Sequence, residues 1–166
     1  MKHFLTAFAL VAATTSPSFA QEDDAFVTFK VLKPEVARTA AVAAMESCRA
    51  QGYQVGVMVV DRFGIPQVYL RDRYAGLHVF ETARRKAWTA VSFRTSTLDL
   101  GNITAPGEMM AGIRELSEPL ALGGGLMIEA AGSIVAGIGV SGAPGPDIDE
   151  RCAQDGIDAI SDDIAF

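Results

Sequence analysis

The sequence contains few cysteines, few histidines and no long hydrophobic run, and each shortage excludes a class of protein. Two cysteines in 166 residues are too few for a disulfide-rich scaffold or a closed zinc site. Two histidines leave no room for a His-rich metal centre. No apolar run approaches the ~20 residues that a membrane-spanning helix needs, so we expect no membrane insertion.

Positive charge is also scarce. There are 14 Lys and Arg against 20 Asp and Glu, which gives a formal net charge of −6 and argues against a nucleic-acid binder. The hydrophobic fraction of 49% is too high for a disordered chain. The length is typical of one domain with a substantial core.

Residues 1–20 have the composition of a secretory signal peptide. Lys2 precedes a short apolar run, and small residues at Ser18 and Ala20 suit cleavage before Gln21. A retained N-terminal anchor is the alternative. The sequence therefore predicts a periplasmic or secreted protein with a single domain over 21–166.

Hydrophobic periodicity predicts helices and hairpins in alternation. Helices are expected over 34–51, 78–93 and 148–160, and hairpin strands over 54–61 with 66–71 and over 126–129 with 134–140. A short apolar stretch at 26–32 is typical of an edge strand, and 95–122 of a loop with a helical piece near 109–116. This order predicts an α+β domain whose antiparallel sheet is covered by helices.

The second predicted helix and its approach are basic. Residues 71–94 hold six bases and two acids, a local charge of +4, and the bases are Arg71, Arg73, Arg84, Arg85, Lys86 and Arg94. Because the guanidinium fork pairs well with carboxylates, the segment favours an anionic ligand, with all of these except Arg94 as candidate binding residues. A solvated helix face with internal ion pairs is the alternative.

His78 is the only histidine after the signal peptide, and it lies within this basic segment. One histidine can supply an axial ligand to haem iron. A helix-start residue without a ligand is the alternative. No catalytic triad is evident, so no catalytic residue is predicted and an enzyme is not favoured.

Four stretches, in order, resemble the GlcG/HbpS family of haem-binding and haem-degrading proteins. They are VMVVDRFG (57–64), RDRYAGLHVFETARRKAWTA (71–90), LGGGLMI (122–128) and GSIVAGIGVSGAPG (132–145). The resemblance implies a profilin-like α/β/α fold, with a five-stranded antiparallel sheet and the first and last helices on one face. It also implies haem as the cofactor and a homo-oligomer.

With this resemblance, we expect an exported haem- or tetrapyrrole-binding protein that serves storage, transfer or sensing. His78 would ligate the iron, and arginines would hold the propionates. An enzyme acting on haem or a small carboxylate is one alternative, and a non-catalytic oligomeric scaffold or sensor accessory is another.

The two cysteines lie on the apolar stripes of the first and last predicted helices. If these helices pack antiparallel on one face of the sheet, the sulfurs of Cys48 and Cys152 can meet. Export would supply an oxidising compartment, so we predict a disulfide between them. Two buried thiols are the alternative.

Overall fold

The computed structural model describes residues 25–165. The predicted signal peptide, and with it the predicted export, lies outside the described residues. The predicted single domain over 21–166 stays a prediction.

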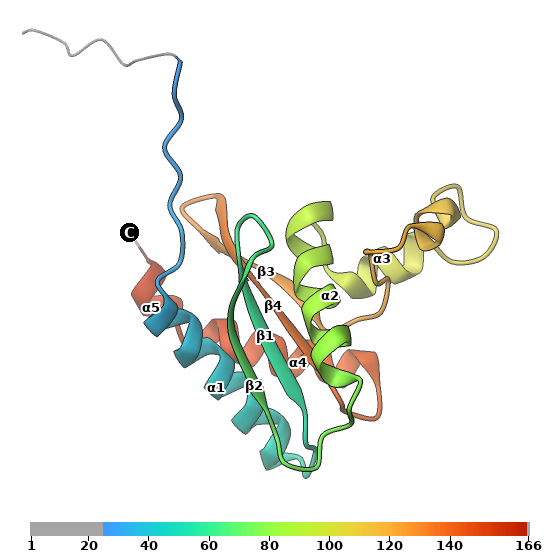
Figure 1. Ribbon diagram of the computed structural model, residues 1–166, viewed down its shortest axis with the longest axis horizontal. Coiled ribbons are helices and arrows are strands. Elements are labelled where there is room, and N and C mark those ends of the chain that lie inside the picture. The colour runs from blue at the N-terminus through green and yellow to red at the C-terminus, as the bar shows by residue number, and fades with distance from the viewer. Residues whose placement is uncertain (1–24, 166) are drawn as a thin grey trace, which may run out of the picture.

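Four antiparallel strands form one sheet in the described part of the chain, in the order β2-β1-β4-β3 (Figure 1). They are β1 (Gly56–Asp61), β2 (Pro66–Arg71), β3 (Gly125–Ala130) and β4 (Ser133–Ser141). The helices are α1 (Pro34–Ala50), α2 (Val79–Phe93), α3 (Thr97–Ile103), the 3-10 helix η1 (Ala111–Glu115), α4 (Pro146–Asp158) and α5 (Ser161–Ile164). Both predicted hairpins are confirmed as β1–β2 and β3–β4.

The sheet lies between two helical layers, with α1 and α4 on one face and α2 on the other (Figure 1). Strand β1 shows why. Val57 and Val59 pack in the α1–α4 core, whereas Met58 and Val60 pack against α2. A strand buried on both faces has a continuous hydrophobic sequence rather than an alternating one. The prediction that the terminal helices share one face is confirmed.

The expected fifth strand is not formed within the described residues. The segment 26–32 is extended but pairs with no strand, and Phe26 is 79% exposed. Its last residue, Leu32, is buried and donates one backbone hydrogen bond to Val135 (3.4 Å). Strand-like composition therefore does not by itself produce a strand here.

The expected 95–122 loop is more regular than its glycines and prolines suggest. The short helical piece near 109–116 is confirmed as η1, but α3 was not predicted. Ser96 caps α3, because its hydroxyl accepts a hydrogen bond from the Asp99 N–H (3.0 Å). In Figure 1 the segment around η1 projects from the body of the molecule.

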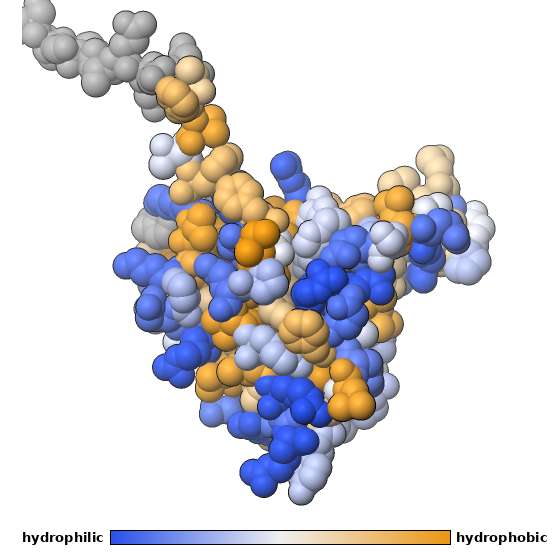
Figure 2. Space-filling view, in the orientation of Figure 1, coloured by the Kyte–Doolittle hydropathy of each residue, from blue (hydrophilic) through white to orange (hydrophobic). Residues whose placement is uncertain are grey.

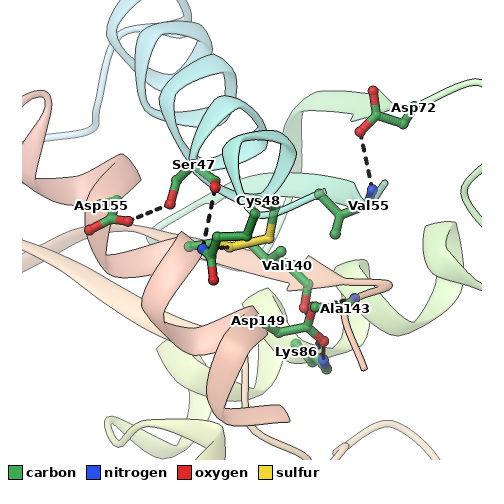
Figure 3. Close-up of a disulfide and its surroundings, with 11 residues drawn as sticks. Ser47, Cys48, Val55, Asp72, Lys86, Val140, Ala143, Asp149 and Asp155 are labelled. Carbon is green, nitrogen blue, oxygen red and sulfur yellow. Dashed lines mark hydrogen bonds and ion pairs between the residues drawn. A yellow bond between two sulfur atoms is a disulfide. The ribbon is translucent and has the colours of Figure 1, made fainter. Parts of the chain in front are cut away.

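The predicted disulfide is present and joins the end of α1 to the second turn of α4 (Figure 3). The Cα atoms of Cys48 and Cys152 lie 5.6 Å apart, and both side chains are buried. Small residues bring these helices together. A Cβ added to Gly156 would lie 2.6 Å from the carbonyl oxygen of Ala40.

Candidate functional site

The structure separates the predicted basic segment into three groups with different environments. The first is Lys86, which lies inside the protein and not on the basic surface where we expected it. Its ammonium donates hydrogen bonds to the carboxylate of Asp149 (2.8 Å) and the carbonyl of Val140 (2.9 Å), as Figure 3 shows. Burial lowers the pKa of Lys86 and raises the pKa of Asp149.

Glycines allow α2 to lie this close to the sheet. A Cβ on Gly139 would lie 2.1 Å from the Ala83 carbonyl oxygen, and a Cβ on Gly125 would lie 2.4 Å from the Lys86 carbonyl oxygen. The glycine-rich strands β3 and β4 therefore serve backbone packing.

The second group is Arg84 and Arg85, which hold the segment before β3. Arg84 pairs with Glu118 (2.5 Å) and Glu81 (3.1 Å), while Arg85 donates to the carbonyls of Glu118 (2.9 Å) and Pro119 (2.8 Å). The hydrogen bond to Glu118 raises the pKa of Arg84, and the same bond lowers the pKa of Glu118. Both guanidinium groups are therefore held by hydrogen bonds within the chain, Arg84 through three of its donors and Arg85 through two.

The third group surrounds the connection from β2 to α2. Arg71 ends β2, and its guanidinium donates one hydrogen bond to the Ala75 carbonyl (2.5 Å). Arg73 is exposed, and no side chain among residues 25–165 pairs with it. Both arginines therefore keep free N–H donors next to the loop that leads to His78.

His78 begins α2, but its imidazole does not cap the helix. Its backbone carbonyl accepts hydrogen bonds from the N–H and the hydroxyl of Thr82 (3.0 and 3.1 Å). The ring is exposed and forms no hydrogen bond within the described chain. It lies against Gly76, where an added Cβ would be 2.6 Å from Cε1. Because Gly76 has no side chain, the ring can lie this close to the backbone, and neither ring nitrogen forms a hydrogen bond within residues 25–165.

Two exposed apolar residues, Leu77 and Phe80, lie close to His78 in the chain. Leu77 is 92% exposed and Phe80 is 48% exposed. Phe80 packs edge-to-face on Tyr69, with ring centroids 4.9 Å apart. The Tyr69 hydroxyl is buried and has no partner in the described chain, and burial raises its pKa. Sequence reasoning missed Tyr69, because a strand tyrosine carries no local signal of an unpaired hydroxyl.

The donor set of this loop is suited to haem. An unpaired imidazole can ligate iron, free guanidinium groups can bind propionates, and exposed apolar side chains can contact a porphyrin. We call His78, Leu77, Phe80, Arg71 and Arg73 the His78 surface. Residues 25–165 contain no cluster of three or more His, Cys, Asp or Glu side chains that could hold a metal ion.

Other residues in the family-like stretches have structural roles. The Asp61 carboxylate accepts hydrogen bonds from the N–H groups of Phe63 (2.8 Å) and Ile65 (2.9 Å) and so closes the first hairpin. The Ser141 hydroxyl accepts a hydrogen bond from Thr82 (2.7 Å). These residues stabilise the sheet and its contact with α2.

The layered α+β fold, with its four-stranded antiparallel sheet between helices, is the fold of the solved HbpS structures. Residues 32–158 match the family model for haem degrading protein HbpS-like, so the chain belongs to the HbpS-like family. This agrees with the resemblance that the sequence stretches indicated. Within the described residues, no helix combines the length and hydrophobicity that crossing a bilayer requires.

Solved structures and one curated protein extend the comparison. A double mutant of HbpS from Streptomyces reticuli has a TM-score of 0.79 and 36% identity, over 89% of this chain and 99% of that chain. PduOC in complex with haem has a TM-score of 0.73 and 30% identity, over 79% and 96%. The corrinoid adenosyltransferase PduO of Salmonella typhimurium is 37% identical over 117 residues, which cover 68% of this chain and 34% of PduO. The chain thus spans about a third of that relative.

Proposed function

We propose that this protein is an exported haem-binding protein that ligates the iron through His78. The observation that carries the proposal is the exposed, unpaired imidazole of His78, in a chain whose relative PduOC has been solved with haem. Storage, transfer and sensing of haem are all compatible with such a site.

The surroundings of His78 support it as the iron ligand. Its ring does not stabilise the helix, and it is held against Gly76 by contact alone. A neutral imidazole nitrogen would supply one axial ligand when haem is bound. Leu77 and Phe80 would cover part of the porphyrin face and exclude water from it.

The hydrogen bonds narrow the choice of propionate partners. Arg84 and Arg85 hold Glu118 and its neighbour, and Lys86 is buried against Asp149. Arg71 and Arg73 retain free donors, so they are the better candidates for pairing with carboxylates.

A homo-oligomer would complete this surface. The His78 surface is open, so one chain covers only part of a haem. The projecting segment around η1 carries Met109, which is 97% exposed, and Leu116, which is also exposed, as expected of residues that a second copy covers. We expect light scattering of the mature protein to give a mass above that of one chain. A monomer at all concentrations, with and without haemin, would contradict the oligomer.

The first test is titration of the mature chain, residues 21–166, with haemin. The wild type should give a saturable Soret shift, and His78→Ala should weaken binding at least about tenfold or lose the shift. His78→Met should bind with an altered spectrum, because sulfur replaces nitrogen at the iron. Glu46→Ala, an exposed change on α1, is the control and should match the wild type.

Each part of the proposal can fail separately. If the wild type shows no saturable shift, the haem function is wrong. If His78→Ala binds with the wild-type affinity and spectrum, only the ligand assignment is wrong. Export is tested by mass spectrometry of the secreted or periplasmic protein, which should begin at Gln21.

Degradation of haem is the second candidate function, favoured by the description of the family as haem degrading. Bound haemin would be incubated with ascorbate in air, and the decay of the Soret band compared with that of free haemin. Faster decay that requires His78 would favour the enzyme. Protection of haemin from decay would favour storage or transfer.

A further inference from the structure

A cleft of about 480 Å³ opens at the end of the molecule where the α1–β1 and β2–α2 connections lie side by side (Figure 1). Figure 2 shows hydrophilic side chains gathered at this end. The polar groups that line the cleft are Arg49, Tyr53, Gln54, Arg71, Arg73 and Tyr74, together with Asp72. We call it the arginine cleft.

Asp72 fixes the floor of the arginine cleft. One of its carboxylate oxygens accepts hydrogen bonds from Arg49 (2.7 and 2.5 Å), and the other accepts one from the N–H of Val55 (3.2 Å). The Tyr74 N–H donates to the Gln54 side-chain oxygen (3.1 Å) across the same two connections. The cleft is therefore preformed, and its walls do not need a ligand to hold them together.

The charge of the cleft is not balanced from within. Three arginines and one carboxylate line it, so its net charge is +2 in a chain of net charge −6. Asp72 is used by Arg49 and the backbone. Arg71 uses one donor on Ala75, and Arg73 uses none within residues 25–165. A concave positive site on an acidic protein attracts anions, because the low-dielectric walls focus its field.

The arrangement of the donors indicates the kind of anion. Arg71 and Arg73 offer two separate planar forks, and each fork matches one carboxylate. Tyr53 and Tyr74 add aromatic surface, which suits the carbon skeleton of an organic ligand rather than a bare inorganic ion. We propose that the arginine cleft binds two carboxylates of a single organic ligand through Arg71 and Arg73, while Arg49 is held by its ion pair with Asp72.

Two ligands share this chemistry. Haem carries two propionates, and the cleft is linked to His78 through neighbouring residues, because Arg71 contacts the Ala75 carbonyl next to Gly76, against which His78 lies. Free di- and tricarboxylic acids carry the same groups. In its haem form the inference rests on the proposed function, whereas as a site for a free acid it does not.

The experiment compares ligands with and without free carboxylates. Haemin and haemin dimethyl ester are titrated by Soret absorbance, and citrate is titrated by calorimetry, into the wild type and Arg73→Gln. Arg73 is the cleaner position because its side chain has no partner to lose. Arg71→Gln is the second variant, and Arg38→Gln, an exposed arginine of α1 outside the cleft, is the matched control.

If the propionates occupy the cleft, Arg73→Gln weakens haemin binding at least about tenfold and leaves ester binding unchanged. If a free acid occupies it, citrate binds the wild type saturably and Arg73→Gln weakens that binding by a similar factor. The control should match the wild type with every ligand.

Wild-type affinity for haemin in both cleft variants, together with no saturable citrate binding, would overturn the inference. So would inorganic phosphate competing as well as citrate, because the cleft would then bind any anion. If the wild type binds neither haemin nor its ester, the proposed haem function is wrong instead. The citrate titration alone then decides whether the arginine cleft binds carboxylates.

Discussion

Replacing Lys86 with methionine should destabilise the protein strongly and in a pH-dependent way. Methionine has nearly the same length as lysine but no charge. In Lys86→Met the buried carboxylate of Asp149 loses its ammonium partner at 2.8 Å and keeps its hydrogen bond from the Ala143 N–H (3.0 Å). The Val140 carbonyl loses a donor as well.

The magnitude follows from this burial. Removing one partner of a buried ion pair costs about 3–5 kcal/mol, because the remaining charge is neither solvated nor compensated. That is a large part of the ~5–15 kcal/mol by which a typical domain is stable. Replacing both partners by apolar residues should cost less, since no charge then remains buried.

The pH dependence has a definite sign. Burial already raises the pKa of Asp149, while Lys86 opposes that rise, so removing the lysine raises this pKa further. An acid whose pKa is higher in the folded state stabilises the fold at low pH and loses that contribution as pH rises through the folded pKa. The cost of Lys86→Met should therefore be smaller at pH 5 than at pH 8.

Urea unfolding at pH 8 and pH 5, followed by the fluorescence of the only tryptophan, Trp88, measures both effects. Lys33→Met is the control and should change the free energy of unfolding by no more than about 0.5 kcal/mol, because Lys33 is exposed. If Lys86→Met lowered the free energy of unfolding by less than about 1 kcal/mol, or by the same amount at both pH values, the proposed role of the buried Lys86–Asp149 pair would be wrong. Since Lys86 does not reach the surface, the folded variant should bind haemin as the wild type does.

Three further predictions concern stability. Reducing the bond between Cys48 and Cys152, which are 104 residues apart, should lower the free energy of unfolding by up to about 4–5 kcal/mol, and a thermal transition unmoved by reductant would contradict this. Gly139→Ala should cost about 1–3 kcal/mol or more, because its Cβ would lie 2.1 Å from the Ala83 carbonyl oxygen; an unchanged urea midpoint would show that α2 is not held by this contact. Glu118→Gln should cost only about 0.2–1 kcal/mol, because its ion pair is partly exposed. The pKa of Glu118 is lowered in the fold, so its contribution is present above the ordinary value of 4.5 and is lost as pH falls through the folded pKa. The free energies of unfolding of Glu118→Gln and the wild type, measured with urea, should therefore become equal at acidic pH. A difference that stays constant with pH would contradict a stabilising ion pair.

Much of the fold could be predicted because its elements obey local rules. The two hairpins join apolar strands through short turns, and the helices carry apolar stripes of the correct period. The disulfide followed from the same reasoning, since Cys48 and Cys152 lie on stripes that face each other. The strand expected at 26–32 failed because strand formation depends on a neighbouring edge, which local composition does not reveal.

The site was less predictable because charge along the sequence does not show where a side chain points. Lys86 was grouped with the arginines although it lies three residues after Ala83 and four before Ala90, on the buried face of the helix. That spacing was the available signal. Its partner Asp149 is 63 residues away, and no local pattern links the two. His78 could be singled out as the lone histidine, but its seat on Gly76 required the structure.

The glycines of β3 and β4 also have a mechanical consequence for the site. These glycines place no side chains between the strands and α2, so the helix backbone lies directly on the sheet backbone. If α2 slid or tilted, its backbone carbonyl groups would collide with the strands, and no flexible side chain is present to absorb the movement. The middle of α2, from Ala83 to Val91, is therefore fixed on the sheet. The segment between Arg71 and His78 is also held, by the hydrogen bonds of Asp72 and Tyr74, so a ligand would meet a preformed backbone on both sides of this connection.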